Sequence, residues 1–130
     1  EVAEIETLPI PDNSVDVVIS NCVINHSPNK VTVFEEAYRV LKPGGRLFVS
    51  DLVTTGRLSD DVRRDADKIW TEWLSVACDR LEYLNAIGSA GFTAVAVLAE
   101  GLFPLSEADV LRGRIISLQV KALKIGKTMA

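Results

Sequence analysis

The sequence predicts one α/β domain, because short apolar runs typical of strands alternate along the chain with amphipathic segments typical of helices. Turn and capping residues separate these segments, most clearly in the Pro-Gly-Gly run at residues 43–45. The chain has 130 residues, of which 48% are hydrophobic and 25% charged, a composition typical of globular domains. This length is enough for a core of its own. We therefore expect residues 1–130 to form a single domain.

The first two elements are a strand and a helix. Residues 15–20 form a β-branched, nearly continuous apolar run, which is typical of a strand buried on both faces. Ser27 and Pro28 then have the residue types of a helix N-cap and of a first helical position. Apolar residues at three- and four-residue spacing extend the predicted helix over 28–42, and the glycines at 44 and 45 end it.

The second part of the chain continues the alternation. The predicted elements are, in chain order, a strand over 46–52, a helix from Ser59 to about residue 77, a helix over 80–90, a strand over 93–98, a short helix over 106–112 and a strand over 114–123. A strand, a crossover helix and a second parallel strand predict at least one right-handed crossover in the sheet.

Composition excludes several classes of protein. A net charge of −4 and an isoelectric point near 5.0 argue against a general nucleic-acid or anionic-membrane surface. No apolar run approaches the roughly 20 residues of a transmembrane helix, and the first residues lack the pattern of a signal peptide. Two cysteines without short metal spacing predict neither a metal site nor a disulfide framework. We expect a reduced, cytoplasmic protein.

Three motifs carry a family resemblance. These are SNCVINHSPNK at 20–30, VLKPGGRL at 40–47 and AGF at 90–92. Together they resemble the second half of a class I S-adenosylmethionine-dependent methyltransferase, and within that superfamily the arsenite methyltransferases, from about residue 4 to 123. The resemblance implies a partial Rossmann-like methyltransferase sheet of about four strands. Two of these are parallel, an antiparallel edge pair follows, and helices lie on both faces.

The resemblance also implies site residues. Cys22 matches the position of a substrate ligand. Glu4 and Ile5 match residues at the adenine edge of S-adenosylmethionine, and Ser20 and Asn21 match residues near its reactive end. It implies no metal ligand and leaves the catalytic residues unknown.

The chain departs from the family pattern in two ways. It contains no Gly-x-Gly-x-x-Gly run, which supplies the close backbone approach to the cofactor, and the acidic residue that holds the ribose is expected upstream of residue 1. S-adenosylmethionine is therefore the cofactor that the resemblance implies. We do not expect it to bind tightly to this chain alone, and we expect the chain alone to be inactive. The family pattern implies a second thiol at the position that Trp73 occupies in this sequence. Cys78 follows five residues later, and on a continuous helix it would point about 140° away from that position.

Several side chains have both a structural and a functional interpretation. Cys22 is either a packed thiol at a strand end or a substrate ligand. The structural interpretations of the others are a buried thiol for Cys78, a solvated loop residue for His26, a loop cap at a strand end for Asp51, and core or interface residues for Trp70 and Trp73.

The resemblance also bears on partners. In the full fold another strand covers the edge of the 15–20 strand, and without that strand the edge has unpaired backbone groups. We therefore expect a homo-oligomer, most simply a two-fold dimer through this edge or adjacent apolar helix faces, or association with a missing N-terminal half. Three functions remain open. They are a methyltransferase domain completed by another polypeptide, a non-catalytic binding or oligomerisation module, and a thiol-based binder of soft metals or metalloids through Cys22.

Overall fold

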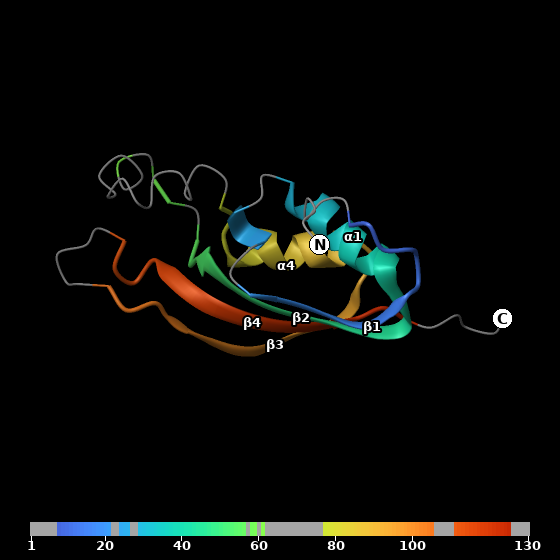
Figure 1. Cartoon of the computed structure of the whole chain (residues 1–130). Coiled ribbons are helices and arrows are strands. Elements are labelled where there is room, and N and C mark those ends of the chain that lie inside the picture. Colours follow the sequence, from blue (N-terminus) through green and yellow to red (C-terminus); the bar gives the residue numbers. More distant parts are fainter. Residues whose placement is uncertain are drawn as a thin grey trace.

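A computed structural model describes residues 8–21, 24–26, 29–56, 58–59, 61, 77–105 and 111–125 (Figure 1). Its elements are, in chain order, β1 (Val15–Asn21), the 3-10 helix η1 (Ile24–His26), α1 (Lys30–Val40), β2 (Leu41–Thr54), α4 (Arg80–Ser89), β3 (Thr93–Leu102) and β4 (Ile115–Leu123). None of the helices among these residues is long and apolar enough to cross a membrane.

The four described strands form one mixed sheet in the order β1-β2-β4-β3. β1 and β2 are parallel, whereas β4 is antiparallel to both β2 and β3. The predicted α/β sheet of two parallel strands followed by an antiparallel pair is therefore confirmed. β4, the last described strand, lies between β2 and β3, so that β1 and β3 are the edges of the sheet as the structure describes it.

The α-helices α1 and α4 lie on the same face of the sheet (Figure 1). α1 and α4 contact each other, and the rings of Phe34 and Tyr83 meet edge to face at 5.5 Å between centroids. Side chains of β2 and β4 alternate between this covered face and the opposite face, as the period of a strand requires. Helices were predicted on both faces, but no helix in the described ranges covers the second one. We call the second face the open face.

Some helix and strand boundaries differ from the prediction, because pairing with a neighbouring strand sets where the element begins or ends. α1 begins at Lys30 with Asn29 as its N-cap, so the predicted start at residue 28 is wrong; Ser27 and Pro28 themselves lie outside the described residues. The helix ends at Val40 rather than residue 42, because Leu41 already pairs with Val15 of β1. β2 and β3 are longer than predicted, because β4 pairs with both over most of their length.

The prediction that the first strand is buried on both faces is wrong. Ile19, near the middle of β1, is 76% exposed, and Val17 is also exposed. β1 is an edge strand, and these two side chains lie on the open face, where no described helix covers them. A continuous apolar run therefore indicated a strand but not the burial of its two faces.

Backbone conformation and packing explain the glycine of the AGF motif. Gly91 has a φ of +113°, a backbone conformation that L-residues with a side chain rarely adopt. A Cβ atom at this position would also lie 3.2 Å from the ring of Tyr38. The glycine therefore allows the chain to leave α4 and enter β3 in contact with α1.

Candidate functional site

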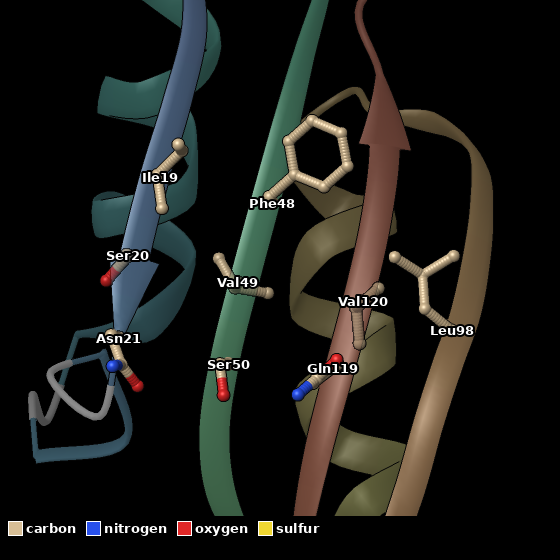
Figure 2. Close-up of a pocket in the computed structure, with 9 residues that line it drawn as sticks. All are labelled: Ile19, Ser20, Asn21, Phe48, Val49, Ser50, Leu98, Gln119 and Val120. Carbon is tan, nitrogen blue, oxygen red and sulfur yellow. The ribbon is translucent and has the colours of Figure 1, made fainter.

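The candidate site lies at the carboxyl end of β1 and beside the middle of β2. The carboxyl ends of parallel strands are where ligands bind in open α/β sheets. Ser20 and Asn21 are the last two residues of β1. Both line a hollow of about 300 Å³ on the open face (Figure 2). The other lining residues come from all four strands and are Ile19, Phe48, Val49, Ser50, Leu98, Gln119 and Val120.

The hollow has a polar and an apolar part. In the lower part of Figure 2, Asn21, Ser50 and Gln119 bring amide and hydroxyl groups from three strands together. In the upper part, Ile19 and Phe48 are register partners and form an apolar surface. The ammonium group of Lys121 lies 5.9 Å from the centre of the Phe48 ring. The hollow can therefore accept hydrogen-bonding and apolar groups side by side.

A buried polar network lies on the other side of the sheet, beneath η1. Asp51 is buried, and its Oδ2 accepts hydrogen bonds from the Asn25 backbone N–H at 3.0 Å and from the Tyr83 hydroxyl at 2.9 Å. Burial raises the pKa of the Asp51 carboxyl, and these hydrogen bonds oppose the rise. Asp51 was expected to cap a loop at a strand end. Asp51 does not end the strand, because β2 continues to Thr54, but its carboxylate does accept a backbone N–H, that of Asn25, from the segment between β1 and α1.

The Asn25 side chain joins three segments of the chain. Its Nδ2 donates to the Leu52 carbonyl at 2.7 Å and to the Cys78 carbonyl at 3.4 Å. Its Oδ1 accepts from the Cys78 backbone N–H at 3.1 Å and from the Cys78 thiol at 3.4 Å. The fully buried amide therefore fixes η1 to β2 and to the segment before α4. Asn25 was not among the predicted site residues, and its position in the 20–30 motif was the one available signal.

The Cys78 thiol has the environment of a structural residue, as predicted. Burial, the largest influence, raises the pKa of this thiol to about 11, and the nearby Lys30 ammonium lowers it in part. Burial in turn lowers the pKa of Lys30. A thiol that stays protonated at neutral pH is a poor nucleophile and a poor ligand for soft metals.

We expect Cys78 to be about 100-fold less reactive than an ordinary thiol near pH 8, because its pKa lies about two units above the ordinary value of 9.0. The Cys22→Ser variant makes Cys78 the single thiol of the chain. Alkylation by iodoacetamide, followed by mass spectrometry, measures its rate in the folded protein and in denaturant, and the rate should rise steeply toward pH 11. Equal rates in the two states would contradict the environment described for this thiol.

The other predicted site residues have different outcomes. Glu4, Ile5 and Cys22 lie outside the described residues and stay predictions, as do Trp70 and Trp73 in their structural roles. His26 lies in η1, but its side chain is also outside the description. Within the described part of the chain, only Ser20 and Asn21 of the predicted set are brought together at one site.

Of the residues predicted to contact S-adenosylmethionine, the structure describes Ser20 and Asn21, which offer a hydroxyl and an amide at the end of β1. Every buried side-chain polar atom in the described ranges has a hydrogen-bond partner. In the same ranges, no group of three or more His, Cys, Asp or Glu side chains is arranged to hold a metal ion.

Comparison with known proteins identifies the family. Residues 1–91 match the family described as a methyltransferase domain. The chain belongs to this methyltransferase family. An arsenic(III) S-adenosylmethionine methyltransferase from Chlamydomonas reinhardtii has a similar crystal structure, with 35% identity and a TM-score of 0.81 over 98% of this chain and 44% of that one. This similarity confirms both the fold and the predicted resemblance to arsenite methyltransferases.

Curated relatives of this methyltransferase domain include arsenite methyltransferases from distant organisms. The enzyme of Halobacterium salinarum is 46% identical over 94 residues, which are 72% of this chain and 24% of the relative. The enzyme of Mus musculus is 44% identical over 124 residues, which are 92% of this chain and 32% of the relative. The chain thus spans between a quarter and a third of the length of these relatives.

Proposed function

We propose that this chain forms the methyl-acceptor half of an S-adenosylmethionine-dependent methyltransferase of the arsenite type and needs a cofactor-binding half for activity. The observation that supports the proposal is the similarity to the algal arsenic(III) methyltransferase, which extends over nearly the whole of this chain but less than half of the algal one. A cofactor-binding half would supply the glycine-rich loop that the 130 residues lack.

The proposed roles follow the family resemblance. S-adenosylmethionine supplies an electrophilic methyl group when it is bound. Ser20 and Asn21 would contact its reactive end, and Glu4 and Ile5 the adenine edge. Cys22 would bind a soft acceptor such as trivalent arsenic, because thiolates are the preferred ligands of soft metal and metalloid centres.

The described residues support the acceptor side of this proposal. Asn25 and Asp51 hold η1, which begins two residues after Cys22 in the sequence, against β2. The Cys78 thiol is half-buried and donates to Asn25 Oδ1 at 3.4 Å, so it is poorly placed to be a second ligand. We therefore propose that any further soft ligand of the acceptor comes from outside the described residues.

Calorimetric titration with S-adenosylmethionine tests the need for a second half. We expect no binding to the chain alone. We expect binding after addition of the fragment of the Halobacterium salinarum relative that precedes the matched region. Tight binding to the chain alone would contradict the need for a second half. Association of the two polypeptides without cofactor binding would contradict the methyltransferase function.

An alternative function is soft-metal or metalloid binding by Cys22 without catalysis. Titration with arsenite separates the two thiols, because the Cys22→Ser variant should lose binding while Cys78→Ser keeps it. Equal binding by the parent and by Cys22→Ser would remove this alternative and the proposed role of Cys22 in the acceptor site.

The remaining alternative is a non-catalytic binding or oligomerisation module. The exposed Ile19 on β1 is the observation that favours it. Self-association does not exclude methyl transfer, so the titration with S-adenosylmethionine in the presence of the fragment distinguishes the two functions.

A further inference from the structure

Two charged side chains of α1 hold the backbone of Leu8, the first residue that the structure describes. The Leu8 N–H donates to Oε1 of Glu36 at 2.7 Å, and the Leu8 carbonyl accepts from Nη2 of Arg39 at 3.1 Å. Both polar backbone groups of Leu8 are therefore bonded to side chains of one helix. We call these two side chains the Glu36–Arg39 pair.

The two members of the pair also fix each other. They are three positions apart in α1, so they lie on one side of the helix. The Arg39 guanidinium donates to both carboxylate oxygens of Glu36, from Nε to Oε2 at 3.0 Å and from Nη2 to Oε1, and its Nη1 donates to the Asp12 carboxylate at 2.7 Å. The hydrogen bond from Arg39 holds the pKa of the Glu36 carboxyl below its ordinary value, so this acceptor is ionised at neutral pH. A bidentate pair of this kind has a defined geometry.

The bonds to Leu8 lie upstream of those that place β1. The backbone N–H groups of Asn13 and Ser14 donate to carbonyl groups at the end of α1, at 2.9 and 2.8 Å. The segment before β1 therefore lies against the end of this helix (Figure 1). The Glu36–Arg39 pair extends the fixed part of the chain from Asn13 back to Leu8, toward the N-terminus.

We propose that the Glu36–Arg39 pair positions the cofactor-binding segment at residues 4 and 5, because it fixes the chain at Leu8. In the proposed function, on which this inference rests, Glu4 and Ile5 contact the adenine edge of S-adenosylmethionine. Leu8 follows Ile5 by three residues, and three residues span at most about 11 Å. A fixed Leu8 therefore limits where Ile5 can reach.

The benefit of such positioning is a lower cost of binding. A segment that is already held in place loses less conformational freedom when the ligand binds. The Glu36–Arg39 pair does not touch the cofactor in this proposal, because it acts through the backbone of Leu8. A pair with only a structural role would stabilise the fold but leave the affinity for the cofactor unchanged.

Two variants remove the pair, and a third is the matched control. Glu36→Ala removes the acceptor of the Leu8 N–H, and Arg39→Met removes the guanidinium but keeps an unbranched side chain. Glu35→Ala makes the same truncation at the neighbouring acid of α1, which is exposed. Alanine and methionine both favour a helix, so each variant should fold, and circular dichroism confirms that it does.

Cofactor affinity is measured by calorimetric titration of S-adenosylmethionine into the chain assembled with the fragment of the Halobacterium salinarum relative. We expect Glu36→Ala and Arg39→Met to weaken binding by about tenfold or more, because the cofactor must then order the segment itself. Glu35→Ala should bind as the parent does. In the chain alone, the backbone amide of Leu8 should exchange hydrogen faster in Glu36→Ala than in the parent or in Glu35→Ala.

Cofactor affinities of Glu36→Ala and Arg39→Met equal to that of the parent would overturn the inference and leave the proposed function intact. An unchanged exchange rate of the Leu8 amide in Glu36→Ala would also overturn it. So would an equal loss of affinity in Glu35→Ala, because the two bonds to Leu8 come from the Glu36–Arg39 pair. A parent assembly that does not bind the cofactor would instead contradict the proposed function, and the inference would fall with it.

Discussion

The Gly45→Ala variant is expected to be less stable than the parent by about 2–3 kcal/mol, because the site has no space for a methyl group. A Cβ atom on Gly45 would lie 2.8 Å from the Lys42 carbonyl oxygen and 3.1 Å from that of Asp16. Both contacts are with backbone, so neither is relieved by a side-chain rotation. Gly45 precedes Arg46, which pairs with Val17 of β1, so a shift there disturbs the parallel pairing of the two strands.

Gly88→Ala is the matched control. No heavy atom lies within 4 Å of a Cβ atom at this position, and the residue is inside α4. Alanine is favoured over glycine in a helix by about 1 kcal/mol, so this variant should be slightly more stable than the parent. Urea denaturation followed by circular dichroism measures both changes. A loss of less than about 0.5 kcal/mol for Gly45→Ala would show that the turn has room that the structure does not indicate.

The strands and helices were predictable from the sequence where local patterns determine them. The 80–90 helix and the 114–123 strand match α4 and β4 within one residue at each end. The Pro-Gly-Gly run correctly indicated that a helix ends before it, although the helix ends at Val40 and the run lies within β2. The burial of β1 was not predictable, because it depends on which segments lie against each face of the sheet rather than on the apolar run itself.

The polar network could not be predicted because it joins residues far apart in the sequence. Asn25 and Asp51 are 26 residues apart, Asp51 and Tyr83 are 32 apart, and Asn25 and Cys78 are 53 apart. No spacing motif connects such positions. Ser20 and Asn21 were found because neighbouring residues at a strand end stay together in any fold that contains the strand.

The Asn25→Ala variant is expected to lose about 2–5 kcal/mol of stability, because it leaves the two closest backbone partners of the side chain, both partly buried, without a hydrogen bond. These are the carbonyl of Leu52, which accepts from Nδ2 at 2.7 Å, and the N–H of Cys78, which donates to Oδ1 at 3.1 Å. Each unsatisfied buried group costs about 1–3 kcal/mol. The Asn25 backbone N–H still donates to Asp51 in the variant, so the loss reports the side chain alone.

Asn21→Ala is the control for the loss of an asparagine side chain. Asn21 is exposed at the end of β1, so its replacement should change the stability by less than about 0.5 kcal/mol. Native-state hydrogen exchange gives a local measurement. The backbone amide of Cys78 should exchange much faster in Asn25→Ala than in the parent, and at the same rate as the parent in Asn21→Ala. Equal stabilities of the two variants would contradict the role of Asn25. A large loss confined to Asn25→Ala would show that the Asn25 amide holds η1 in place, because this side chain bonds to both β2 and the Cys78 segment.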